Sequence, residues 1–154
     1  DTATVYPGTC LFEGTNLSEG RGTTKPFEII GAPWIDSHNL ADSLNNLFLH
    51  GVKFRPVYFI PTFSKHRDQS CGGVQVHVID RDKFTPVRTV LNMLETIKRL
   101  YPDEFQFIKH FDLLMGTDKV RNDLSRRHSV DDVIQSWKDE MLDFANVRSK
   151  YILY

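Results

Sequence analysis

A dense polar segment near the start of the chain constrains the fold more than any other feature. Residues 13–24 read Glu-Gly-Thr-Asn-Leu-Ser-Glu-Gly-Arg-Gly-Thr-Thr, in which Leu17 is the one apolar side chain. Neither the alternation of a half-buried strand nor the period of an amphipathic helix is present. The three glycines in the segment permit positive φ and close approach of the backbone to a ligand. The sequence therefore predicts a shaped loop. An ordinary surface loop, with its Asn and Ser in turns and its Glu and Arg paired, has the same composition.

The signals along the rest of the chain predict an α+β fold, because strands come first and helices dominate the second half. We expect strands over residues 9–12, 27–30, 54–63 and 73–80, and a weaker extended piece over 105–108. We expect helices over residues 39–50, 86–100, 118–126 and 130–144. Two prolines place the 54–63 strand at a sheet edge. Ser129 and Asp132 have the spacing of a capping box before the last helix.

Length and charge exclude several classes of protein. A chain of 154 residues fits one domain. The net charge of −1 gives no field to attract nucleic acid or anionic lipid. No apolar run approaches the roughly 18 residues of a membrane-spanning helix. Cys10 and Cys71 are too far apart in sequence for a zinc motif, so they form either a disulfide or, as we favour, two buried free thiols.

Four segments give the chain a family resemblance. The run from Tyr6 to Trp34 contains the polar segment, and the shorter runs 71–78, 100–102 and 148–154 agree with it. Together they resemble the NamZ-type exo-β-N-acetylmuramidases, which are peptidoglycan-recycling glycoside hydrolases. The resemblance implies a single domain over residues 1–154, the C-terminal domain of a larger enzyme whose upstream Rossmann-like domain is absent. It also implies a small mixed, partly barrel-like sheet with about four helices.

The resemblance implies a function for the larger protein. That protein would hydrolyse terminal MurNAc from peptidoglycan fragments in the periplasm or outside the cell, without a cofactor. This domain would contribute one wall of an interdomain active site, so the isolated chain is expected to be nearly inactive. The alternative is a non-catalytic module that binds muramyl sugars or peptidoglycan, or that supports its partner domain.

The polar segment contains the candidate catalytic groups. Hydrolysis of a glycosidic bond needs a general acid and a second group that attacks the anomeric carbon or activates water. Glu19 and Glu13 are the candidates, although the sequence leaves open whether they converge, and a salt bridge would explain each equally. Arg21 suits the lactyl carboxylate of muramic acid, because a guanidinium donates two parallel hydrogen bonds to a carboxylate. It would otherwise clamp Glu13, Glu19 or Glu28.

Four further polar residues are candidates for substrate binding. Asn16 and Thr23 would hydrogen-bond the sugar, or would instead form turns that shape the loop. Gln75 and His77 share one face of the 73–80 strand, opposite three valines, and would bind substrate if that face lines the cleft. The spacing of the histidines predicts no metal site.

Overall fold

The three strands of the computed structural model form one open sheet, and the α+β class is confirmed. The model describes residues 1–126 and 128–152. The strands are β1 (Ile29–Ala32), β2 (Val52–Phe59) and β3 (Cys71–Val78). Their order is β1-β3-β2 and both pairings are antiparallel. The expectation of a mixed, partly barrel-like sheet is therefore wrong, because three short antiparallel strands do not close on themselves.

Prolines and glycines fix the places of the strands in the sheet. β2 lies at an edge, as predicted, and carries Pro56 opposite Val74 of the central strand. In β3 the backbones approach so closely that a Cβ on Gly73 would lie 2.0 Å from the carbonyl oxygen of Ile30. No larger residue fits at this position without displacing β1.

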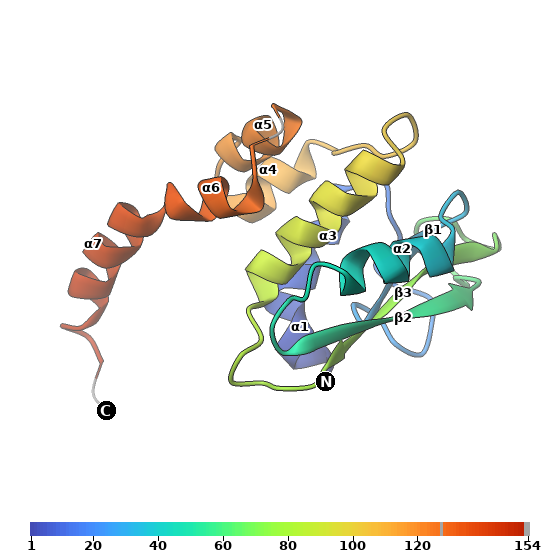
Figure 1. Ribbon diagram of the computed structural model, residues 1–154, viewed down its shortest axis with the longest axis horizontal. Coiled ribbons are helices and arrows are strands. Elements are labelled where there is room, and N and C mark those ends of the chain that lie inside the picture. Colours follow the sequence, from blue (N-terminus) through green and yellow to red (C-terminus); the bar gives the residue numbers. More distant parts are fainter. Residues whose placement is uncertain (127, 153–154) are drawn as a thin grey trace.

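Helices cover the sheet and continue beyond it (Figure 1). They are more numerous than the four expected: α1 (Thr2–Thr9), the 3₁₀ helix η1 (Cys10–Gly14), α2 (Ser37–Asn45), α3 (Pro86–Leu100), α4 (His110–Met115), α5 (Lys119–Ser125), α6 (Val130–Gln135) and α7 (Lys138–Arg148). The predicted helix over 86–100 is confirmed with Pro86 at its first turn. Its buried face, which includes Leu91, Leu94 and Ile97, forms the centre of the core.

The prediction of a strand over residues 9–12 is wrong. These residues belong to the end of α1 and to η1, and the buried face of α1 packs on α3. Gly8 makes this contact possible, because a Cβ there would lie 2.3 Å from the carbonyl oxygen of Pro86. Burial of Val5 and Thr9 against α3 outweighs the low helix propensity of β-branched residues.

Other boundaries differ from the expected ones by a few residues. Phe27 has a φ of 66° and belongs to a turn, so the strand expected over 27–30 begins at Ile29. The helix expected over 39–50 is α2, which ends at Asn45. Residues 105–108 are not a strand, and Phe107 makes an isolated bridge with Thr15.

The helix expected over 130–144 is interrupted. Ser129 caps its start as predicted, accepting a hydrogen bond from the backbone N–H of Asp132 (3.1 Å). The hydroxyl of Ser136 donates to the carbonyl oxygen of Val133 (2.7 Å), a contact that bends helices. The amide of Trp137 then bonds in 3₁₀ fashion, and α7 starts in a new direction, away from the body of the domain (Figure 1).

Both cysteines are free thiols, as predicted, but only Cys71 is buried and Cys10 is half-buried. Burial raises the pKa of the Cys71 thiol to about 11. In the described part of the chain, no helix has the length and apolar character that crossing a membrane requires.

Candidate functional site

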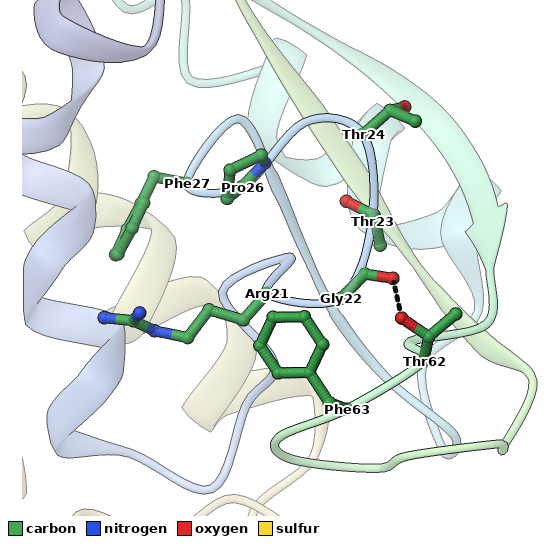
Figure 2. Close-up of a pocket in the computed structure, with 8 residues that line it drawn as sticks. All are labelled: Arg21, Gly22, Thr23, Thr24, Pro26, Phe27, Thr62 and Phe63. Carbon is green, nitrogen blue, oxygen red and sulfur yellow. Dashed lines mark hydrogen bonds between the residues drawn. The ribbon is translucent and has the colours of Figure 1, made fainter.

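Two loops pack against each other at the polar segment. Gly20 and Gly22 have φ values of 78° and 81°, the left-handed conformation that glycine permits. The carbonyl oxygen of Gly22 accepts hydrogen bonds from the amide and the hydroxyl of Thr62, both at 3.0 Å (Figure 2). A Cβ on Gly22 would lie 2.7 Å from the backbone nitrogens of Thr62 and Phe63. Residues 13–28 are therefore held by the connection between β2 and β3.

Arg21 joins the two candidate carboxylates. Its Nη2 lies 3.1 Å from Oε2 of Glu13, and its Nε lies 3.1 Å from Oε1 of Glu19. Its guanidinium carbon also lies 5.1 Å from the centre of the Phe27 ring. Because both carboxylates contact one guanidinium, Glu13 and Glu19 converge, which the sequence had left open.

Lys65 completes the cluster and was not predicted from the sequence. Its Nζ lies 3.1 Å from Oε2 of Glu19. It also donates to the carbonyl oxygens of Phe12 (2.9 Å), Leu17 (3.0 Å) and Glu13 (3.3 Å). Glu19 is only 2% exposed. One of its carboxylate oxygens contacts Arg21 and the other contacts Lys65, so its buried charge is paired on both sides.

The loop that carries Lys65 is strained. Ser64, His66 and Asp68 have φ values of 70°, 56° and 60°, which costs roughly 1 kcal/mol or more for each. Such conformations persist where the surroundings fix them, and here His66 Nε2 lies 2.8 Å from the carbonyl oxygen of Asn16. The prediction of a strand over residues 54–63 is wrong at its end, because β2 ends at Phe59. The signal missed was the run of polar residues 64–70 between two strands.

An open pocket of about 520 Å³ lies beside Arg21, a size suited to a small ligand. Figure 2 shows the residues that line it, which are Arg21, Gly22, Thr23, Thr24, Pro26, Phe27, Thr62 and Phe63. The Phe63 ring lies beside Arg21 and is largely exposed. The pocket thus combines a cation, hydroxyl groups and an aromatic ring.

Asn16 and Thr23 hold the loop in shape. The Asn16 amide donates to the carbonyl oxygen of Glu104 (2.7 Å), and its oxygen accepts from the amide of Gln106 (3.0 Å). The Thr23 hydroxyl donates to the carbonyl oxygen of Gly20 (2.7 Å). The Thr23 contact matches the turn-forming alternative. The Asn16 contacts do not, because they join the loop to residues 104–106 and form no local turn. Contact of either residue with a sugar stays a prediction.

Gln75 and His77 lie apart from the Arg21 pocket. With Lys25 and Glu28 among other residues, they line a separate cavity of about 150 Å³. Gln75 is buried and accepts a hydrogen bond from Arg55 Nη2 (2.7 Å). His77 Nε2 is buried and has no hydrogen-bond partner within the described residues. Their contact with substrate stays a prediction, and the structure does not bring them into the Arg21 pocket.

Glu28 is the buried carboxylate outside the cluster. Burial works to raise its pKa, but hydrogen bonds from Thr2 (2.7 Å) and Lys25 (3.0 Å) and the charge of Lys25 outweigh burial. The pKa of Glu28 is therefore lower than its ordinary value. Arg21 does not clamp this carboxylate, which pairs with Lys25 instead. Across residues 1–126 and 128–152, no three His, Cys, Asp or Glu side chains are grouped to hold a metal ion.

Comparisons with known proteins agree in one family. A family model described as the C-terminal part of the exo-β-N-acetylmuramidase NamZ matches residues 4–154. A peptidoglycan β-N-acetylmuramidase NamZ of Bacillus subtilis is 50% identical over 152 residues, which are 97% of this chain and 37% of that protein.

Two solved structures of DUF1343 family proteins from Bacteroides fragilis have the same fold. One superposes with a TM-score of 0.89 at 33% identity, covering 99% of this chain and 42% of the other. The second has a TM-score of 0.70 at 26% identity, covering 99% and 40%. The chain thus spans about two fifths of the length of these relatives.

Proposed function

Because the chain belongs to the family of C-terminal domains of the exo-β-N-acetylmuramidase NamZ, we propose that it forms one wall of a glycoside hydrolase active site. In this proposal an upstream Rossmann-like domain of the same polypeptide supplies the other wall. The full-length protein releases terminal MurNAc from peptidoglycan fragments. Since peptidoglycan lies outside the cytoplasm, the protein acts in the periplasm or outside the cell.

The observation that carries the proposal is the bridge from Arg21 to both carboxylates beside an open pocket. The bridge brings together the two kinds of group that the substrate requires. Carboxylates perform the acid and base steps of glycoside hydrolysis, and a guanidinium recognises a carboxylate such as the lactyl group of MurNAc.

The two carboxylates differ in exposure and in how many of their oxygens already contact cations. Both oxygens of Glu19 contact cations and its side chain is buried, so we assign it to orienting Arg21 and Lys65. The side chain of Glu13 is 24% exposed, and one of its oxygens contacts Arg21. We therefore assign Glu13 to the acid or base step. A group in the other domain supplies its counterpart.

Arg21 is the proposed contact for the lactyl carboxylate. Its side chain is 41% exposed although Nε and Nη2 already bind glutamates. Arg21 lines the pocket, and we assign the part of its guanidinium that the two glutamates do not occupy to an anionic group. The Phe63 ring offers an apolar surface to the sugar ring, and Thr24 and Thr62 add hydroxyl groups.

The test is release of p-nitrophenol from a MurNAc glycoside by the full-length protein and by this chain. We expect turnover by the full-length protein alone. In that protein Glu13→Gln should lower kcat by about 100-fold or more, the usual contribution of a positioned acid or base. Asp112→Asn is the matched control, because Asp112 is 25% exposed and paired with Arg121, but it is not part of the cluster.

Other outcomes assign other functions. If Glu13→Gln and Glu19→Gln both keep near-normal kcat in the full-length protein, the loop is a scaffold and the catalytic assignment is wrong. If the full-length protein has no activity but this chain binds MurNAc in calorimetry, and Arg21→Ala abolishes binding, the domain is a sugar-binding module.

A further inference from the structure

α7 carries several large apolar side chains that the described part of the domain leaves exposed. None of its residues is buried. Four of its large apolar side chains are more than half exposed: Met141, Leu142, Phe144 and Val147. Figure 1 shows why, since the helix extends away from the sheet and from α3.

One side of α7 borders an apolar groove of about 480 Å³. Its lining residues are Met115, Thr117, Trp137, Glu140, Met141, Phe144, Ala145 and Arg148. Leu142 and Val147 lie outside this groove. At about 100° per residue they point to opposite sides of the helix, on either side of the face that contains Met141 and Phe144. The exposed apolar side chains thus span more than half of the circumference of α7, with charged side chains between them. This arc is wider than the apolar stripe of roughly 100° that packing on one surface needs.

We propose that α7 and this groove form the docking surface for the rest of the same polypeptide, the upstream domain of the proposed function on which this inference rests. The relatives are more than twice as long as this chain. A full-length protein of that size would have enough further residues to cover the helix. A solved relative of that length superposes on nearly all of this chain, so the fold that exposes α7 is compatible with a longer polypeptide.

The direction of α7 supports the same occupant. The helix projects from the end of α6 away from the sheet and α3, so it is accessible to a further domain on several sides (Figure 1). A second copy of the domain fits less well. A flat dimer contact would cover one side of α7 and leave Leu142 or Val147 in water, whereas a further domain of the same polypeptide can enclose several sides.

Hydrogen exchange of α7 amides tests the proposal in the full-length protein and in this chain. We expect exchange over residues 138–148 to be about tenfold slower or more in the full-length protein, because an interface suppresses local opening. Equal rates in the two proteins would overturn the proposal. If exchange of the α7 amides is also slow in this chain, and slows further as the protein concentration rises, the surface binds a second copy. That result would overturn the proposal as well.

A pair of variants locates the contact. Phe144→Glu in the full-length protein should remove the slow exchange, while Ile79→Glu should preserve it. The two side chains are matched, at 66% and 65% exposed, and neither belongs to the proposed active site. Retained protection in Phe144→Glu, with melting and circular dichroism unchanged, would refute the docking surface.

The two proposals fail independently. If the full-length protein protects α7 but hydrolyses no MurNAc glycoside, the proposed function is wrong and the docking surface stands. If it hydrolyses the glycoside while α7 exchanges freely, the docking surface is wrong and the proposed function stands.

Discussion

Replacement of Lys65 by methionine tests the energetics of the cluster. Methionine keeps most of the length of the side chain and removes the charge and all donors. Glu19 would then keep Arg21 as its one cation, and three backbone carbonyl oxygens would lose a donor. The buried carboxylate makes this loss costly, because nearby water cannot replace the ammonium group.

The magnitude follows from these contacts. Removing one partner of a buried ion pair costs about 3–5 kcal/mol. The value here lies at the low end, since Arg21 still contacts Glu19 and the Lys65 side chain is 26% exposed. We expect the free energy of unfolding to fall by about 3 kcal/mol. For a chain of this size that corresponds to a decrease in Tm of roughly 6–12 °C.

Urea unfolding followed by circular dichroism at pH 7 measures this loss. Lys83→Met is the control, because Lys83 pairs with Asp80 at 3.0 Å on the surface, where its side chain is 68% exposed. That variant should lose about 0.5 kcal/mol or less. If Lys65→Met loses no more than Lys83→Met, the reasoning fails. Combining Lys65→Met with Glu19→Gln should cost less than the sum of the two, since no unpaired charge remains.

Three further variants test the supports of the loop. Asn16→Ala should lower the free energy of unfolding by about 2 kcal/mol in urea titrations, because it removes two hydrogen bonds to residues 104–106; an unchanged midpoint would contradict this. Gly22→Ala should lower Tm, since alanine disfavours the φ of 81° and its Cβ would collide with the 62–63 backbone, and a Tm equal to that of the wild type would refute the geometry. Glu28 has a pKa that is lower folded than unfolded, so its stabilisation is present above the unfolded pKa of about 4.3 and is lost as pH falls through the lower folded pKa. Urea midpoints measured from pH 6 to pH 3 should therefore fall less steeply in Glu28→Gln than in the wild type, and parallel curves would contradict the shift.

The elements with a strong local signal were predictable. The regular apolar stripe of α3 and its first-turn Pro86 gave its bounds directly, and the alternating valines identified β3. α1 was not predictable, because its helical state depends on contact between Gly8 and α3, about 80 residues away in sequence. The interruption before α7 coincides with a hydrogen bond from the Ser136 hydroxyl to the backbone, which a pattern of apolar residues does not reveal.

The candidate site was predictable in part, for a related reason. Glu13, Glu19 and Arg21 stand close in sequence within an unusual loop, so composition alone drew attention to them. Lys65 comes from a different loop, and its place beside Glu19 follows from how β2 and β3 bring that loop across the domain. Its contribution was visible only in three dimensions.

The loop's long-range attachments have a kinetic consequence. Its contacts join residues separated by 40 positions (Gly22 to Thr62), 46 positions (Glu19 to Lys65) and 90 positions (Asn16 to Gln106). Contacts between residues so far apart in sequence require the closure of long loops, which costs entropy. They therefore form only after helices and other contacts have offset that cost. We therefore expect α3 and its neighbours to gain protection first during refolding, and the Glu19–Lys65 pair to form with the last cooperative step. A chain that is folded in part would then have helices but no Arg21 pocket.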